Sequence, residues 1–447
     1  SCKSLNQLLN FVRKMAEFLP IILFLTVLIF IMLGYPVAFT LGGIAIIFGI
    51  ISIGIEIFSL LPLRIYGIMN NFTLLAVPLF IFMGIILEKS NLAESLLKSI
   101  AFSFGNKEGG LTLGVVLVGA ILGATTGVVG ATVVTLAVIA LPILIENNYD
   151  KAISAGTIAT AGTLGQIVPP SIILLLLADI VGVPVGRIFL GAIVPSLILI
   201  FSYICYIFLA TNSKMNFDKS NLSLNQEIST KEIVISTIPA VILITLVLGA
   251  IITGIASPTE SAAIGCLGAI VLAFGNRCLN FKTLLEAAID ASKLSSMVFA
   301  ILIGATAFSL VFKTMGGDFL IREIFETDSG KFTFLITSML IIFVLGFFLD
   351  FIEICFILVP ILLPVSALFE IDPLWFAILI AINLQTSFLT PPFGFSIFYL
   401  KAAAKNAITT QEIYRGVIPF VALQLCTLFL VIAFPKLITW LPDYFDK

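Results

Sequence analysis

The sequence has no histidine and few charged residues. Of its 447 residues, 11% are Lys, Arg, Asp or Glu, and 60% are apolar. Soluble domains carry roughly 25% charged residues, so this chain cannot cover a water-facing surface. We therefore expect a membrane protein whose outer surface faces the lipid bilayer. The missing histidine also excludes histidine-bound metals, Ser-His-Asp triads and imidazole proton relays.

The sequence also lacks a large excess of either positive or negative charge, and it lacks closely spaced pairs of cysteines. The chain has 23 Lys and Arg against 25 Asp and Glu, and none of its six cysteines forms a Cys-x-x-Cys pair. An even charge balance offers no basic patch for nucleic acid, so we expect no nucleic acid partner. Scattered cysteines in apolar runs are typical of buried free thiols.

Apolar runs long enough to cross a bilayer fill most of the chain. About 20 apolar residues span the ~30 Å of hydrocarbon. Ten runs have roughly that length: Phe18–Leu33, Pro36–Ile53, Phe72–Leu87, Ala152–Ile180, Arg187–Leu209, Ile233–Ile255, Pro258–Phe274, Met297–Phe312, Pro373–Tyr399 and Ile418–Phe434. The pattern predicts an all-α multi-pass membrane protein with about ten spans. The first run has spanning length, which favours a retained span over a cleaved signal peptide.

Two longer apolar runs, Leu111–Ile145 and Phe332–Leu368, have an irregular middle that contains glycine. Each is either two tight spans or a re-entrant hairpin that enters and leaves on one side. The polar middle favours the hairpin, because irregular backbone at membrane depth is tolerated against protein but not against lipid.

A single shift of 222 residues aligns the two halves of the chain. Four of the nine prolines in the first half then coincide with a proline in the second, where about 0.4 would be expected by chance: Pro36 with Pro258, Pro142 with Pro364, Pro169 with Pro391 and Pro170 with Pro392. Five spans and one hairpin per half give the halves opposite membrane orientation. An inverted repeat of this kind is typical of secondary transporters.

The repeat divides the chain into regions. We expect an amphipathic head at residues 1–17, a first repeat at 18–210, a polar linker at 211–232 and a second repeat at 233–447. All irregular segments fall late in each half, so 18–110 and 233–331 are the predicted scaffold, and 111–210 and 332–447 the moving transport part. The head has three open interpretations: a tag remnant, a trimmed start, or the tail of a fused upstream subunit.

Two Pro-Pro segments, Thr163–Ser171 and Gln385–Phe393, interrupt apolar runs at equivalent repeat positions. A proline lacks the amide that would bond the carbonyl four residues earlier. The carbonyls expected to be freed are those of Gly165, Gln166, Ser387 and Phe388. Free carbonyls at mid-membrane suit a cation. The unbonded amides that open each following half-helix suit an anion, and we place substrate at Pro170, Ser171, Pro392 and Gly394.

Asp350 and Glu353 lie three residues apart inside the second long run. Carboxylates within a membrane are functional by default. The alternative is a pair near the interface or bridged to a Lys or Arg of the scaffold, and the sequence leaves both interpretations open.

Four segments resemble one transporter family. Gly254–Ala263 reads Gly-Ile-Ala-Ser-Pro-Thr-Glu-Ser-Ala-Ala and is similar to a signature of the large membrane subunit of tripartite ATP-independent periplasmic (TRAP) transporters. Asn71–Phe80, the Val-Pro-Pro-Ser segment and the Leu-Thr-Pro-Pro-Phe-Gly segment also match, in the family's order. The resemblance extends from about Met15 to the C-terminus.

The resemblance implies an elevator-type carrier in the bacterial inner membrane, driven by sodium, for small organic acids such as 2-oxo, hydroxy or dicarboxylic acids. It also implies a small four-helix membrane subunit and a periplasmic binding protein as partners, and no organic cofactor or enzyme activity. Each hairpin tip would face one broken helix. One departure is Thr-Thr-Gly-Val-Val-Gly at the first tip, where many members have a Ser-Gly-Ser-like sequence.

Two sodium sites follow from these expectations, because hard cations prefer oxygen ligands. The first would use Thr125, Gly127, Gly165 and Gln166. The second would use Gly346, Ser387 and Thr390, with Asp350 close enough to stabilise the ion.

Three other functions remain open at this stage. A stand-alone ion-coupled anion symporter would share the inverted repeat but need no binding protein. An intramembrane aspartyl protease would need a second carboxylate opposite Asp350, for which Asp179 is the main candidate. A structural membrane scaffold would not need two broken helices.

Overall fold

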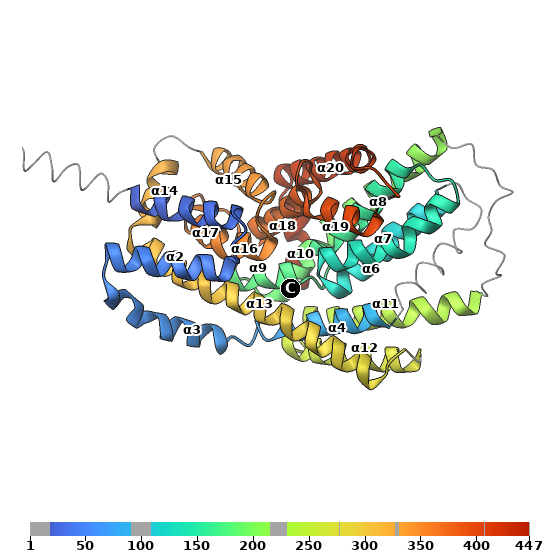
Figure 1. Cartoon of the computed structure of the whole chain (residues 1–447), viewed down its shortest axis with the longest axis horizontal. Coiled ribbons are helices and arrows are strands. Elements are labelled where there is room, and N and C mark those ends of the chain that lie inside the picture. The colour runs from blue at the N-terminus through green and yellow to red at the C-terminus, as the bar shows by residue number, and fades with distance from the viewer. Residues whose placement is uncertain are drawn as a thin grey trace, which may run out of the picture. The chain divides into compact units, whose positions relative to one another are not determined.

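The computed structural model describes residues 18–90, 109–214, 230–276, 278–326, 330–405 and 407–446. Within these ranges every regular element is a helix and no strand occurs, which confirms the predicted all-α class (Figure 1). The predicted head at 1–17 and most of the linker at 211–232 lie outside the described residues.

One compact unit combines the described part of Ser1–Asn71 with Ser295–Pro373. Its first segment holds an apolar helix at Phe18–Met32, α2 (Val37–Ser52), the 3-10 helix η1 (Ile55–Leu60) and α3 (Leu61–Met69). Its second segment holds the end of α13 (Phe281–Thr314), α14 (Gly317–Glu326), α15 (Lys331–Leu345), α16 (Phe351–Ile357) and α17 (Val359–Leu368). A Cβ on Gly304 would lie 2.5 Å from the carbonyl oxygen of Ala38, so glycine lets α2 and α13 pack closely.

The other unit combines Phe72–Leu294 with Leu374–Lys447. Before the linker it holds α4 (Ala76–Lys89), α6 (Gly110–Thr126), α7 (Val129–Glu146), α8 (Lys151–Thr163), η2 (Leu164–Gln166), α9 (Ile172–Val181) and α10 (Val185–Lys214). After it come α11 (Thr230–Ile252), α12 (Pro258–Gly275), the start of α13, α18 (Pro373–Leu389), α19 (Phe395–Ala404), α20 (Thr410–Ala433) and α21 (Lys436–Phe445). Helix α8 contacts α6, α7 and α20 and is buried from Ile153 to Thr163, so it forms the centre of this unit.

The two compact units do not coincide with the predicted scaffold and transport regions. The second hairpin falls in the same unit as α2 and α3, and α4, α11 and α12 fall in the same unit as the Pro-Pro segments. Compact units are defined by packing, whereas scaffold and transport regions are defined by movement. The predicted assignment of 18–110, 111–210, 233–331 and 332–447 therefore stays a prediction.

Short local signals set several helix starts. The Ser257 hydroxyl accepts a hydrogen bond from the Glu260 amide (3.3 Å), and Glu260 Oε2 accepts one from the Ser257 amide (2.8 Å). This reciprocal capping box starts α12. Thr409 and Glu412 start α20 in the same way.

The helix boundaries repeat with the shift of 222 residues that aligns the prolines. Helix α8 begins at Lys151 and α18 at Pro373, 222 residues later, and α7 and α17 end at Glu146 and Leu368 with the same separation. The backbone agrees as well, because Asn148 and its equivalent Glu370 both have a positive φ, of 57° and 51°. The internal repeat predicted from proline positions therefore extends to local structure.

The number of spans differs from the predicted ten when length and hydropathy alone are applied. Among the described residues, five helices are long and apolar enough to cross a membrane, or six if the bent pair α16–α17 is one span. Several other apolar helices are shorter, and some of them, such as α9 and α19, are short because a break divides the run that contains them. The runs predicted at Ala152–Ile180 and Pro373–Tyr399 are each two helices joined by an irregular segment.

Candidate functional site

The first interrupted helix places polar backbone in the core of its unit. Helix α8 ends at Thr163, η2 follows, and α9 starts only after Ser171. All residues from Ile153 to Ala178 are buried except Val168. The second interruption, between Leu389 and Phe395, separates α18 from α19. The Pro-Pro peptide bonds in both segments are cis. Both predicted breaks are therefore confirmed.

Three of the four carbonyls expected to be free, those of Gln166, Ser387 and Phe388, accept hydrogen bonds, which corrects the expectation that proline leaves them unpaired. The Ser171 hydroxyl donates to the Gln166 carbonyl (3.1 Å), and the Ser396 hydroxyl donates to the Phe388 carbonyl (3.2 Å). The Ser387 carbonyl accepts the Thr390 amide (3.2 Å). Hydroxyls and turn amides thus replace the missing helical donors. A carbonyl oxygen has two lone pairs, so each can still accept a cation.

The structure places the hairpin tip that carries Thr125 and Gly127 against η2, which carries Gly165 and Gln166. The tip of the hairpin formed by α6 and α7 packs on η2, and a Cβ on Gly123 would lie 2.5 Å from the Gly165 amide nitrogen. Gly127, with φ 60°, ends α6 and donates its amide to the Gly123 carbonyl (2.9 Å). The Thr125 hydroxyl donates to the Leu122 carbonyl (2.8 Å), so its oxygen keeps lone pairs for a cation. The oxygen donors fit sodium, and sodium binding itself stays a prediction.

The residues of the second predicted sodium site belong to both units. Thr390 and Ser387 lie in one, and their hydroxyls donate to the carbonyls of Thr386 (2.7 Å) and Leu384 (2.9 Å). Gly346 and Asp350 lie in the other, where Gly346 follows the last residue of α15. Each hydroxyl keeps oxygen lone pairs for a cation. The complete site stays a prediction.

Asp350 and Glu353 have a local role that the sequence analysis missed. Asp350 Oδ1 accepts the Phe351 amide (2.8 Å), and the Asp350 amide donates to Glu353 Oε2 (3.1 Å). The two carboxylates form a capping box that starts α16. The Asp-x-x-Glu spacing is the signal that could have predicted it. The capping box therefore explains the presence of Asp350 by a structural role, without the catalytic role that the protease hypothesis gives it.

The four predicted substrate residues lie at the starts of the two half-helices. Ser171 and Gly394 are the N-caps of α9 and α19, and neither helix has a side-chain cap on its first amides. Pro170 is buried beside Ser171, and the Pro392 carbonyl accepts the Tyr414 hydroxyl (2.9 Å). The uncapped amides can therefore bind an anion.

A polar core between the interrupted helices was not predicted. The Gln385 side-chain amide donates to the Thr163 hydroxyl (3.4 Å) and to the Tyr203 hydroxyl (3.5 Å), and Gln424 donates to the same tyrosine (2.9 Å). All four residues are fully buried. Thr163 and Gln385 are repeat equivalents, 222 residues apart. In an inverted repeat, residues related by the pseudo-two-fold axis touch only near that axis, so the predicted repeat would place its axis close to this contact.

Several buried side-chain atoms around this core lack a protein partner within the described ranges. Both amide atoms of Gln166, and Oε1 of Gln385 and of Gln424, are in this group. Buried polar groups in native proteins nearly always bond to protein, water or ligand. Glutamines within apolar runs were the sequence signal for this core.

The chain was compared with known families and proteins. The sequence model of the family described as "Tripartite ATP-independent periplasmic transporter, DctM component" matches residues 24–437. The C4-dicarboxylate TRAP transporter large permease protein DctM of Vibrio cholerae is 28% identical, over 94% of this chain and 97% of that protein. The isethionate TRAP transporter permease protein DctMQ of Oleidesulfovibrio alaskensis is 27% identical, over 92% of this chain and 64% of that protein.

The fold is also similar to a solved structure. The crystal structure of the Alcanivorax borkumensis YdaH transporter matches with a TM-score of 0.61 at 15% sequence identity, and the match covers 85% of this chain and 89% of that one. At this identity the likeness concerns the fold alone.

Proposed function

Because this chain belongs to the tripartite ATP-independent periplasmic transporter family, DctM component, we propose that it is the large membrane subunit of a sodium-coupled importer of small organic acids. The family places the chain among transporters rather than enzymes. The observation that supports the mechanism best is the meeting of two interrupted helices at the repeat-equivalent residues Thr163 and Gln385.

The proposed substrate is a small anion, most simply a 2-oxo, hydroxy or dicarboxylic acid. The amides that open α9 and α19 carry no side-chain cap, and the positive end of a helix dipole favours negative charge. The named substrates of the two relatives, a C4-dicarboxylate and isethionate, are both anions. Substrate would lie between Pro170 and Ser171 on one side and Pro392 and Gly394 on the other.

Sodium is the proposed coupling ion. The hydroxyls of Thr125, Ser387 and Thr390 all donate to backbone carbonyls, which turns oxygen lone pairs toward other ligands. Hard cations prefer such oxygens. Protons are the rival coupling ion, but the chain has no histidine to relay them.

An elevator mechanism is proposed for the movement. An inverted repeat gives two equivalent halves with opposite orientation, and alternating access then moves one part of the protein against another. In an elevator, the moving part carries the bound substrate with it. The repeated helix boundaries support the repeat. The moving part would contain the hairpins and both interrupted helices.

The proposed partners are a small four-helix membrane subunit and a periplasmic binding protein, in a bacterial inner membrane. The family name supports this, because it describes a tripartite and periplasmic system. The exposed apolar side chains of α10 and α20 would face lipid or another membrane helix.

Proteoliposomes test the proposal. The chain would be reconstituted alone, with the small membrane subunit, and with that subunit plus the binding protein, and uptake of radiolabelled C4-dicarboxylates and hydroxy acids would be measured. We expect uptake only with all three proteins and an inward sodium gradient. Full-rate uptake by the chain alone would instead support the stand-alone symporter, and uptake that follows only a pH gradient would contradict sodium coupling.

A further inference from the structure

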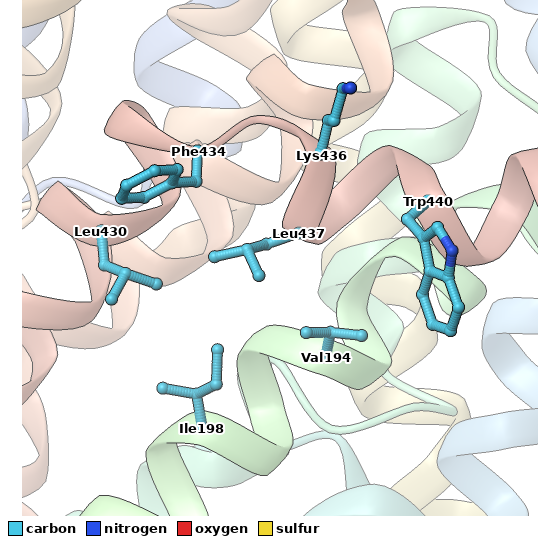
Figure 2. Close-up of a pocket in the computed structure, with 7 residues that line it drawn as sticks. All are labelled: Val194, Ile198, Leu430, Phe434, Lys436, Leu437 and Trp440. Atoms are coloured by element: carbon cyan, nitrogen blue, oxygen red, sulfur yellow. The ribbon is translucent and has the colours of Figure 1, made fainter.

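An apolar groove lies on the unit that contains the interrupted helices. It has a volume of about 650 Å³ and lies between α10, the end of α20 and α21. Figure 2 shows the seven residues that line it: Val194, Ile198, Leu430, Phe434, Lys436, Leu437 and Trp440. Six of the seven side chains are apolar or aromatic, so the groove suits a hydrocarbon chain.

Specific contacts fix helix α21, which closes one side of the groove. Arg187 at the start of α10 forms ion pairs with Asp443 and with Asp446, each at 3.1 Å. Ile438 is fully buried, and a Cβ on Gly191 would lie 3.1 Å from its side chain. Helix α21 is therefore held against α10 at both ends, and the groove beside it is a built feature.

A charged residue and an aromatic residue indicate that one end of the groove lies at the membrane–water interface. Lys436 is the one charged residue in the lining. Among the described residues its ammonium forms no ion pair, because the two carboxylates at the end of the same helix, Asp443 and Asp446, bind Arg187 instead. Trp440 is 61% exposed although it lies on the groove. Tryptophan and lysine at the end of a span are typical of the level of the lipid headgroups.

We propose that this groove binds one anionic phospholipid, with an acyl chain along the apolar lining and the phosphate on the Lys436 ammonium. Charge complementarity selects this occupant over a neutral lipid, because each Lys or Arg near the membrane surface attracts anionic lipid. This proposal is independent of the substrate and of sodium.

Native mass spectrometry tests the proposal on the purified full chain. The protein would be incorporated into nanodiscs with equal amounts of phosphatidylglycerol and phosphatidylcholine that carry identical acyl chains, then released, and the retained lipids counted. We expect about fivefold more phosphatidylglycerol than phosphatidylcholine on the wild type, because one lysine attracts the net negative charge of phosphatidylglycerol, which the choline group of phosphatidylcholine cancels.

Three variants sharpen the test. Lys436→Gln should abolish the preference for phosphatidylglycerol, and Val194→Phe, which fills the groove, should lower retention of both lipids. Lys282→Gln, at an 85% exposed lysine on α13, should behave like the wild type. Equal retention of the two lipids by the wild type, or an unchanged preference in Lys436→Gln, would overturn the proposal. Loss of the lipid when the small membrane subunit is co-purified would also overturn it and assign the groove to that subunit.

Discussion

At both helix interruptions, a serine hydroxyl donates the hydrogen bond that a backbone amide would donate in a continuous helix. Ser171 and Ser396 donate to the carbonyls of Gln166 and Phe388, so the prolines do not leave these carbonyls without a donor. A buried group that loses its partner costs about 1–3 kcal/mol. The two serines therefore stabilise an irregular backbone that a membrane core would otherwise disfavour.

Removal of the Ser171 hydroxyl should destabilise the protein. Ser171→Ala leaves the fully buried Gln166 carbonyl without its donor, and we expect a loss of about 1–3 kcal/mol in the free energy of unfolding. A lower melting temperature in detergent, followed by tryptophan fluorescence, would show it. Ser202→Ala is the matched control, because its hydroxyl donates to a carbonyl within α10 (2.8 Å) and not at a break. Equal melting temperatures for the two variants would contradict the role of Ser171.

Removal of the Thr390 hydroxyl should weaken sodium coupling. Thr390→Ala removes one predicted oxygen ligand but leaves the turn, so the half-saturating sodium concentration for uptake should rise roughly fivefold to tenfold, the equivalent of about 1 kcal/mol. Thr427→Ala is the control, since this hydroxyl donates to the Leu423 carbonyl (2.9 Å) in an uninterrupted helix. An unchanged sodium dependence in Thr390→Ala would exclude that residue from the second site.

For single residues, the sequence predicted where the helices break better than it predicted which side chains contact one another. The Pro-Pro segments identified the breaks, because a missing amide is a local property of the residue. The bond from Ser171 to Gln166 could not be predicted, because it depends on how the irregular segment turns. The contact of Tyr203 with Gln385 and Gln424 joins three helices, and a sequence gives no distances between helices.

Helices α8 and α20 pack backbone against backbone. A Cβ on Gly156 would lie 2.1 Å from the Gly416 carbonyl oxygen, and one on Gly416 would lie 1.9 Å from that of Ala152. Only glycine fits at either position. This crossing holds the first interrupted helix against a long span.

A methyl group at this crossing should separate the two helices. Gly156→Ala is expected to lower the free energy of unfolding by about 1–3 kcal/mol, because overpacking forces the backbone to shift. The melting temperature in detergent would show the loss. Gly249→Ala on α11 is the control, since a Cβ there meets nothing within 4 Å, and it should be neutral or slightly stabilising. A Gly156→Ala melting temperature equal to that of Gly249→Ala would contradict the close crossing.

The element order was predictable, whereas the groups that pack together were not. Length and hydropathy located the apolar runs, and the irregular middles of 111–145 and 332–368 correspond to breaks after Thr126 and Leu345. Helix α4 belongs to the first half of the sequence and α12 to the second, yet they pack together in one compact unit. No local pattern in the sequence encodes that pairing.

For the whole molecule, the inverted repeat predicts that equivalent loops lie on opposite sides of the membrane. Pro184 follows α9 and Lys405 follows α19, and both are exposed. Pro184→Cys and Lys405→Cys, in a background without native cysteines, should react with a membrane-impermeant maleimide from opposite sides of inside-out and right-side-out vesicles. Labelling of both from the same side would contradict the inversion.

The position of α8 also has a consequence for biosynthesis. Gly416 follows Gly156 by 260 residues, so at about 5–20 residues per second a ribosome needs roughly 13–50 s to deliver the partner of α8 after α8 itself is made. The face of α8 that includes Gly156 is later covered by α20. During that time this face has no protein partner and contacts the translocon or the lipid. Assembly of the first interrupted helix is therefore completed by a segment that is synthesised 260 residues later.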